Sequence, residues 1–298
     1  MMRVAVFGCN GFLGRHMVKY LTENCKNLSL QLFDLQENTA FSSLNYQILD
    51  ISNLDMVNKI DFEFDMIYFF SGLTGTEVSN VEAEKFIKVN ELGLLNVLNC
   101  IIKYPKFTNK LIFPSTRLVY KGEVGQLLSE ESPKEFKTIY ALNKFSSENI
   151  LKIYGLKYNL KYSIFRVGVP YGNEIDGKIS YGTIGFFLEL ATKGLNLGVY
   201  GDGKMRRTFT YITDICKQLF NVSILNQSNC ETFNIMGENL SIIDVAQMIA
   251  EKYNVKVEFR SFSERELILE SGDTIFDDSK IKLLLSNFEP IKFKNWIV

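Results

Sequence analysis

The sequence predicts an α/β fold in which helices cover both faces of a doubly wound parallel sheet. Two observations predict it. Up to about residue 172, short apolar, β-prone runs alternate with amphipathic helical segments. Small and polar residues follow the ends of these runs, as they do where ligands bind at the carboxyl edge of such a sheet. Beyond that point the alternation weakens, and we expect a smaller C-terminal lobe.

The first expected strand, Val4–Phe7, leads into three spaced glycines and then into a helix over Arg15–Asn24. Gly8 allows a tight turn, Gly11 lets a ligand approach the backbone, and Gly14 lets the helix pack against the strand. Backbone N–H groups and a helix N-terminus in this arrangement suit a pyrophosphate. A tight turn without a ligand is the alternative interpretation of the glycines alone.

The second expected strand, Leu28–Phe33, ends in Asp34, twenty residues after Gly14. A carboxylate at this place accepts hydrogen bonds from ribose hydroxyls and repels a 2′-phosphate. No arginine follows in the next four residues, so the sequence favours NAD over NADP. Asp34 as a solvated turn residue is the alternative. Together, strand, turn, helix and acid predict a Rossmann-type sheet.

The third expected strand, Tyr46–Leu49, ends in Asp50. Asp50 and Ile51 at this strand end suit contact with an adenine edge. Capping of the next helix through Ser52 and Asn53 is the alternative. The remaining strands are expected at Met66–Phe70, Lys110–Pro114, Tyr162–Val167 and Phe233–Met236, and the remaining helices at Leu54–Lys59, Val81–Tyr104, Ile139–Gly155, Thr183–Thr192, Ile242–Tyr253 and from Asp278.

Composition excludes several function classes. The 298 residues are 46% hydrophobic and 22% charged with a net charge of −1, and no basic run suggests a nucleic-acid partner. No apolar run is long enough to span a membrane, and we expect no secretory signal. Five scattered cysteines without a CxxC pair and one histidine, His16, favour a reducing cytoplasm and no metal site.

Tyr140 and Lys144 are four residues apart on an expected helix, so their side chains share a face. A free tyrosine has a pKa of about 10. A neighbouring ammonium and a cationic nicotinamide ring would favour the phenolate, which can take a proton from a sugar hydroxyl. Thr116, at the end of the neighbouring strand, could hold the same oxygen. The spacing alone is common by chance, and it gains weight from the nucleotide-binding turn before it.

With these motifs the sequence resembles the extended short-chain dehydrogenase/reductase superfamily, and within it the NAD-dependent epimerase/dehydratase family of nucleotide-sugar enzymes. The resemblance covers essentially the whole chain. The residues that carry it are Gly8, Gly11, Gly14, Asp34, Asp50, Ile51, Asn90, Ser115, Thr116, Val119, Tyr120, Tyr140, Lys144, Arg166, Tyr171, Gly172, Gly201, Gly203, Arg207 and Asp214.

The resemblance implies that Thr116, Tyr140 and Lys144 are catalytic and that Arg207 pairs with a substrate diphosphate. We expect an NAD-binding Rossmann domain over 1–168, with a return segment at about 208–236, and a substrate-binding lobe from 169–207 and 237–298. The residues expected to contact NAD are Gly8, Asn10, Gly11, Phe12, Leu13, Gly14, Asp34, Leu35, Asp50, Ile51, Phe70, Ser71, Gly72, Asn90, Tyr140, Lys144, Val167 and Val169. Those expected to contact the sugar nucleotide are Thr76, Thr116, Tyr140, Val169, Asn173 and Arg207.

The resemblance also suggests a homodimer through the helices near 81–104 and 138–154, and a role in polysaccharide biosynthesis. Helices with more apolar surface than one sheet can cover give a physical motive for the dimer.

Departures from the family pattern narrow the reaction. Arg117 and Leu118 stand where 4,6-dehydratases carry an Asp-Glu pair, so dehydration is not expected. Val169 stands in place of a substrate-holding asparagine, and Lys121 in place of a glycine. The main hypothesis is an NAD-dependent epimerase acting at C4 of a nucleotide-activated hexose. A net 4-keto reductase or 4-dehydrogenase stays open, as does a non-catalytic NAD-binding sensor.

Overall fold

The computed structural model describes residues 1–37, 41, 44–104, 110–173, 175 and 182–297. Contacts between residues divide the chain into two compact units. The first unit consists of Met1–Thr116, Thr138–Phe165 and Leu219–Thr232, and the second of Arg117–Lys137, Arg166–Gln218 and Phe233–Val298. Each unit is therefore assembled from three stretches of sequence. The domain bounds predicted from the sequence, with an NAD-binding domain and a separate substrate-binding lobe, stay predictions.

A parallel sheet organises the first unit. Its strands are β1 (Met2–Phe7), β2 (Leu28–Asp34), β3 (Asn45–Ile48), β4 (Met66–Phe69), β5 (Lys110–Thr116), β7 (Lys161–Val167) and β11 (Glu231–Asn234). Among the described residues they lie in the order β11-β7-β5-β4-β1-β2-β3. β1 pairs in parallel with both β2 and β4, so the chain moves outward from β1 in two directions. The predicted doubly wound α/β fold is confirmed.

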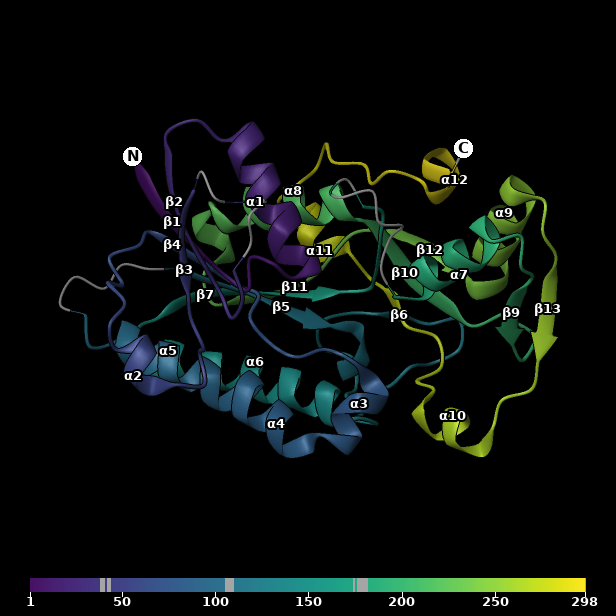
Figure 1. Cartoon of the computed structure of the whole chain (residues 1–298), viewed down its shortest axis with the longest axis horizontal. Coiled ribbons are helices and arrows are strands. Elements are labelled where there is room, and N and C mark those ends of the chain that lie inside the picture. Colours follow the sequence, from purple (N-terminus) through teal and green to yellow (C-terminus); the bar gives the residue numbers. More distant parts are fainter. Residues whose placement is uncertain (38–40, 42–43, 105–109, 174, 176–181, 298) are drawn as a thin grey trace. The chain divides into compact units, whose positions relative to one another are not determined.

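The helices of the first unit are α1 (Phe12–Asn24), α2 (Leu54–Val57), α3 (Thr76–Val81), α4 (Ala83–Ile87), α5 (Gly93–Ile101) and α6 (Ile139–Tyr158), with the end of α8 (Ile212–Ser223). Figure 1 shows α1 on one side of the sheet and α5 and α6 on the other. The rings of Tyr20 in α1 and Phe220 in α8 have centroids 6.0 Å apart, so these helices lie side by side.

The region predicted as one helix, Val81–Tyr104, is divided into shorter pieces. α3 ends at Val81, the backbone of Glu82 leaves the helical region (φ −104°, ψ 40°), and α4 begins at Ala83. A π-helical turn, Lys88–Leu92, then joins α4 to α5. The backbone stays helical from Ala83 to Ile101 through this turn, so the predicted long helix is present. It begins after the break at Glu82 and contains a π-helical turn, two details that a period of apolar residues does not report.

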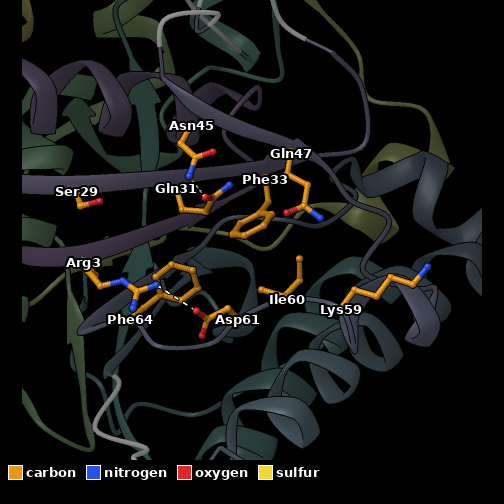
Figure 2. Close-up of a pocket in the computed structure, with 10 residues that line it drawn as sticks. All are labelled: Arg3, Ser29, Gln31, Phe33, Asn45, Gln47, Lys59, Ile60, Asp61 and Phe64. Atoms are coloured by element: carbon orange, nitrogen blue, oxygen red, sulfur yellow. Dashed lines mark hydrogen bonds and ion pairs between the residues drawn. The ribbon is translucent and has the colours of Figure 1, made fainter.

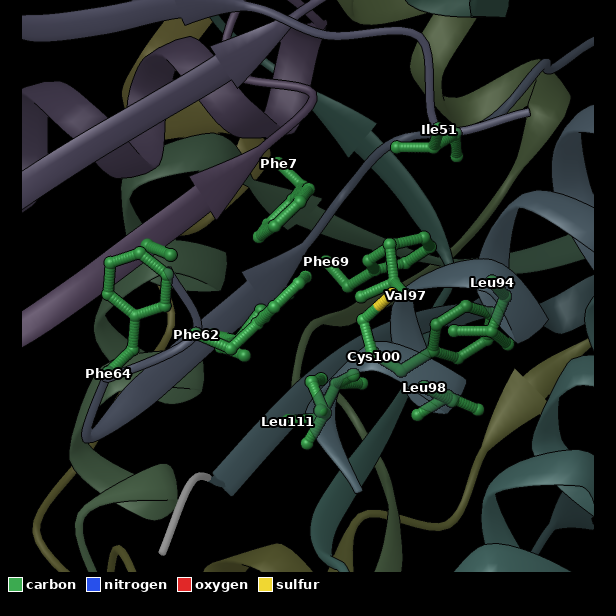
Figure 3. Packing of buried hydrophobic residues seen from close by; sticks show 14 of the residues in the cluster. Phe7, Ile51, Phe62, Phe64, Phe69, Leu94, Val97, Leu98, Cys100 and Leu111 are labelled. Carbon is green, nitrogen blue, oxygen red and sulfur yellow. The ribbon is translucent and has the colours of Figure 1, made fainter. Parts of the chain in front are cut away.

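Aromatic and aliphatic side chains form the core between the sheet and α5 (Figure 3). The ring centroid of Phe7 lies 4.5 Å from that of Phe33 and 5.9 Å from that of Phe69, and Leu94 and Val97 are fully buried. Burying one such side chain stabilises a fold by roughly 1.5–3 kcal/mol. This packing fixes the carboxyl ends of β1, β2 and β4, where the predicted cofactor residues begin.

The segment Leu219–Thr232 is tied to the sheet of the first unit by a buried lysine. Lys110 opens β5, and its Nζ donates to Ser223 O at 2.8 Å, to Leu225 O at 3.1 Å and to Ser228 Oγ at 2.6 Å. Burial lowers the pKa of Lys110 to about 8. The three acceptors offset the cost of burying its ammonium group.

The second unit holds shorter elements. Its strands are β6 (Leu127–Leu128), β8 (Val169–Tyr171), β9 (Leu197–Tyr200), β10 (Arg206–Tyr211), β12 (Glu238–Ser241), β13 (Val257–Arg260) and β14 (Ile275–Phe276), and its helices α7 (Gly182–Thr192), α9 (Ile242–Tyr253), α10 (Glu264–Leu269), α11 (Ser279–Lys282) and α12 (Phe293–Ile297). The strands pair as β12-β10-β8, β13-β9 and β14-β6. A separate core holds α7, α9 and α12 on these strands. α9 begins with the capping box of Ser241 and Asp244, and it spans the residues predicted.

Candidate active site

The glycine turn follows β1 and opens α1. Gly8 has φ +78°, and a Cβ added there would lie 2.5 Å from Ser71 N. A Cβ at Gly14 would lie 2.0 Å from Gly8 O, and Gly11 forms the N-cap of α1 without a side chain. Glycine is thus required at Gly8, where the loop after β4 comes close, and at Gly14, where α1 packs against the turn. The sequence predicts a pyrophosphate at the start of α1, where Gly11 is exposed, and this stays a prediction.

Asp34 lies at the end of β2 and joins the glycine turn. Its Oδ2 accepts a hydrogen bond from Asn10 N at 2.9 Å, and its Oδ1 accepts one from Leu35 N at 2.7 Å. Each carboxylate oxygen has a second lone pair, so Asp34 keeps acceptors for ribose hydroxyls. The Asn10 amide in turn donates to Gln36 O and Tyr46 Oη, at 2.8 and 3.0 Å. These bonds fix the carboxylate of Asp34 beside the glycine turn. Phe12 and Leu13, in the first turn of α1, are half-buried.

Asp50 follows β3 and closes a local turn. Its Oδ1 accepts hydrogen bonds from both Ser52 N and Ser52 Oγ at 2.8 Å. The cap of α2 is Asn53, which accepts a bond from Met56 N at 3.2 Å. Of the residues considered for capping α2, Asn53 is therefore the one that caps the helix, and Asp50 fixes the turn before it. Ile51 is buried in the core.

Asn90 holds the loop that follows β4. It is buried in the π-helical turn, where its Oδ1 accepts a bond from Leu73 N at 2.7 Å and its Nδ2 donates to Leu73 O at 3.0 Å. Both bonds fix the loop of Phe70, Ser71 and Gly72 at the carboxyl edge of the sheet. Thr76, which begins α3, is exposed.

The three residues predicted to be catalytic lie on β5 and α6. Thr116 is buried at the end of β5, and Tyr140 is in the first turn of α6. That turn is fixed by Thr138, whose side chain accepts a bond from Ala141 N at 3.1 Å. One helical turn further, Lys144 Nζ donates to Pro114 O at 2.9 Å, two residues before Thr116. The bond ties the helix that carries Tyr140 to the strand that carries Thr116.

Burial changes the acidity of Lys144. Its Nζ lies 4.5 Å from the centroid of the Phe113 ring, and burial lowers its pKa to about 8, against the opposing effect of Glu148. At neutral pH it remains an ammonium that can favour a nearby phenolate.

The second unit contains a cavity of about 390 Å³ that is lined by two arginines, Arg117 and Arg207, and by Glu270, Val169 and several aromatic side chains. Arg207 is 3% exposed, forms an ion pair with Glu270 and donates to Arg206 O at 2.9 Å. Burial lowers the pKa of Arg207. The sequence predicted a diphosphate partner for Arg207, and in this structure a carboxylate of the chain itself occupies its guanidinium.

Three further predicted residues lie at the end of β7 or shortly after it. Val167 ends that strand, and Val169 begins β8 opposite Phe209 of β10. Gly168 between them leaves no space for a side chain, because a Cβ there would lie 2.1 Å from Thr208 O. Asn173 is half-buried, and its Oδ1 accepts a bond from Ile175 N at 3.0 Å.

Sequence reasoning missed several residues of this cavity. The sequence marks Arg117 only as a departure from the dehydratase pattern, although an arginine directly after Thr116 is a usable signal. Glu270 gave no signal. The missed aromatic residues are Phe186, Phe187, Tyr200 and Phe262.

A second cavity, of about 280 Å³, lies in the first unit (Figure 2). Arg3 beside it forms ion pairs with Asp61 at 3.4 Å and Glu63 at 2.5 Å. None of its lining residues belongs to the predicted site. Within the described ranges, no group of three or more His, Cys, Asp or Glu side chains could hold a metal ion. A search of the same residues finds no helix long and apolar enough to cross a membrane.

Comparisons with known proteins show which sequences and folds this chain resembles. The chain is 28% identical over 260 residues to a putative UDP-glucose 4-epimerase of Methanocaldococcus jannaschii, covering 86% of this chain and 84% of that protein. It is 28% identical over 278 residues to the dTDP-D-glucose 4,6-dehydratase of Mus musculus, covering 89% and 76%. The crystal structure of Thermus thermophilus UDP-glucose 4-epimerase in complex with NAD superposes with a TM-score of 0.85 at 25% identity, covering 99% of this chain and 96% of that one.

A family model, that of the NAD dependent epimerase/dehydratase family, matches residues 4–235. This match spans most of the chain, and the solved structure described above contains NAD. The protein is a member of the NAD-dependent epimerase/dehydratase family, and its cofactor is NAD.

Proposed function

We propose that the protein is an epimerase that acts at C4 of a nucleotide-diphosphate hexose through a 4-keto species. One observation carries the proposal. Tyr140 lies one turn before Lys144 on α6, and the Lys144 Nζ bond to Pro114 O ties that helix to β5, the strand that ends at Thr116. This arrangement supports proton transfer at a sugar hydroxyl.

The cofactor is held by the glycine turn, by Asp34 and Asp50, and by the loop that Asn90 fixes. When bound, NAD supplies a hydride acceptor and donor at its nicotinamide ring. Thr116 donates a hydrogen bond to the C4 oxygen of the sugar. Tyr140 removes the proton of the C4 hydroxyl and later returns it, and the ammonium of Lys144 lowers the pKa of Tyr140.

The cavity of the second unit binds the nucleotide half of the substrate. Arg207 pairs with the diphosphate, since a planar guanidinium matches phosphoryl oxygens bidentately. The aromatic side chains offer surfaces on which a base can stack; the rings of Tyr200 and Phe262 have centroids 5.3 Å apart. Val169, Asn173 and Thr76 contact the remainder of the sugar nucleotide.

Arg117 and Leu118 support an assignment other than 4,6-dehydratase, because neither side chain can supply the acid and base that water elimination needs at this place. Relatives with dehydratase activity exist, so this distinction rests on these two residues. A net 4-keto reductase is the second candidate, favoured by Val169 in place of a substrate-holding asparagine.

The test begins with the nucleotide that the purified protein releases on denaturation. Native protein is then mixed with UDP-, GDP-, CDP- and dTDP-hexoses while the absorbance of reduced nicotinamide is followed. An epimerase interconverts two sugars with retained NAD and no net absorbance change. Stoichiometric oxidation or reduction of added cofactor identifies a dehydrogenase or reductase, and bound NAD without any sugar conversion favours a sensor.

Tyr140→Phe separates the catalytic role from a structural one. Removal of the phenolic hydroxyl is expected to lower the turnover number by at least about 100-fold with NAD retained. Tyr158→Phe makes the same chemical change at an exposed position of α6 and serves as the control. Unchanged conversion by Tyr140→Phe would end the acid–base assignment.

A further inference from the structure

The cavity of the second unit contains unequal numbers of positive and negative groups. Arg207 is neutralised by Glu270, whose carboxylate contacts its guanidinium. Arg117 donates instead to two neutral hydroxyls, Ser271 Oγ at 3.2 Å and Thr274 Oγ1 at 2.9 Å. Among the described residues no carboxylate forms an ion pair with Arg117. The residues that line the cavity therefore carry two positive charges and one negative charge, and the buried carboxylate of Asp273 also acts on Arg207 from outside this lining.

Two guanidinium groups in one partly buried cavity repel each other. Desolvation lowers the pKa of the Arg117 guanidinium, the positive charge of Arg207 lowers it further, and the carboxylate of Glu270 opposes both effects. Desolvation strengthens this repulsion relative to water. A ligand group with two negative charges and several oxygen acceptors removes it, and each guanidinium can bind such oxygens through parallel N–H groups. A diphosphate has this chemistry.

The position of Glu270 allows its side-chain carboxylate to move away from the guanidinium of Arg207. It follows α10, its backbone oxygen accepts a bond from Lys137 Nζ at 2.6 Å, and its side chain is 25% exposed. The backbone is thus anchored while the carboxylate has access to solvent. A phosphoryl group and this carboxylate would repel each other at the guanidinium of Arg207, so only one of them can occupy it.

We propose that Arg117 and Arg207 together bind the diphosphate of the substrate, and that Glu270 is an internal counter-ion which the diphosphate displaces from Arg207. The proposal rests on the proposed function, since it assumes a nucleotide-diphosphate substrate. Arg117 follows Thr116 directly in the chain, about 3.8 Å from it between Cα atoms.

The experiment measures binding by calorimetry to the NAD-loaded protein. UDP, GDP, CDP and dTDP are compared first, and the nucleoside diphosphate that binds most tightly is used with its free nucleoside. Arg117→Gln is expected to weaken diphosphate binding by about 10- to 100-fold, the usual range for lost hydrogen bonds to a charged group. Glu270→Gln is expected to tighten it by about tenfold. Nucleoside binding should stay unchanged in both variants.

Matched controls change the same charges outside the cavity. Lys204→Gln removes an exposed positive charge before β10, and Glu264→Gln removes an exposed negative charge at the start of α10. Ser271→Ala removes one of the hydroxyls that fix Arg117 and is expected to weaken diphosphate binding a few-fold. Because it keeps both arginines, it tests the proposal even where Arg117→Gln does not fold.

The outcomes separate this inference from the proposed function. Failure of the wild-type protein to bind any nucleoside diphosphate would overturn the proposed function itself. Diphosphate binding that is equal in Arg117→Gln and Lys204→Gln would overturn the role of Arg117 alone. Weaker binding by Glu270→Gln would show that Glu270 assists the ligand. A loss confined to hexuronate nucleotides would assign Arg117 to a sugar carboxylate instead.

Discussion

At the scale of single residues, burial decides how Lys144 behaves. Its folded-state pKa of about 8 lies below the ordinary lysine value of 10.5, because the ammonium is desolvated. Between pH 8 and pH 10.5 the folded protein therefore binds fewer protons than the unfolded chain. The loss of folding stability caused by burying the ammonium is complete below about pH 8 and absent above about pH 10.5. The protein carries a destabilising charge at the place where the proposed chemistry needs it.

Replacing Lys144 should exchange activity for stability. Lys144→Met is expected to raise the free energy of unfolding at pH 7 by on the order of 1–3 kcal/mol, and the gain should shrink towards pH 10. Urea denaturation at the two pH values measures it, with Lys152→Met on the same helix as control. A gain that does not change with pH would contradict burial of the charge as its source. Sugar conversion should be lost in the Lys144 variant.

Asn90 is a positioning residue whose two bonds to Leu73 define the loop after β4. Asn90→Ala leaves both backbone groups of Leu73 without their partner, at a cost of roughly 1–3 kcal/mol. We expect a lower melting temperature and about tenfold weaker NAD binding, measured by fluorescence titration. Asn90→Asp keeps the acceptor for Leu73 N, so its melting temperature and NAD affinity should lie between those of the wild type and of Asn90→Ala. Full NAD affinity in Asn90→Ala would show that the loop holds its position without this side chain.

At the scale of elements, the sequence predicts helices and strands that depend on neighbouring residues, but it does not predict those that depend on distant parts of the chain. The sequence predicted α9 to the residue, because a capping box marks its start within four residues. It predicted β1, β2 and α6 from continuous apolar runs and helical spacing. It gave no strand at β8, β10 or β12, since these short strands of mixed polarity depend on partners far along the chain. The pairing of Arg207 with Glu270 spans 63 residues and could not be predicted in the same way.

The cap of α9 allows a direct measurement of one local signal. Ser241→Ala removes the oxygen that accepts a bond from Asp244 N at 3.1 Å. The expected loss of stability is about 1 kcal/mol, seen as a lower urea midpoint with an unchanged slope. Ser241→Asp should retain most of it, since aspartate also caps helices well. A loss as large in the aspartate variant would point to packing of Ser241 in place of capping.

At the scale of the whole molecule, exposed apolar side chains on α6 form a candidate surface for the predicted homodimer. Leu142 and Ile153 are 43% and 57% exposed, and eleven residues, about three helical turns, place them on one face of α6. Leu156, 90% exposed, lies one turn beyond Ile153. Exposed apolar side chains in a row of this kind are typical of a covered interface.

Sedimentation tests the dimer. The wild-type protein is expected to sediment as a dimer at micromolar concentration, and the double variant Leu142→Glu/Ile153→Glu as a monomer. Leu283→Glu, at an 84% exposed position of the second unit, should leave the dimer intact. A wild-type monomer at this concentration would contradict the prediction.

The bonds of Lys110 to Ser223, Leu225 and Ser228 also bear on how the chain is made. The strands β1 to β5 leave the ribosome long before residues 223–228 have been synthesised. The first unit therefore cannot complete its folding until its last stretch, Leu219–Thr232, is available. Until then the Lys110 ammonium lacks its acceptors, and the edge of β7 lacks β11. A fragment ending near residue 168 should therefore be a poor expression target, and the nascent protein a candidate for chaperone binding until about three quarters of it has emerged.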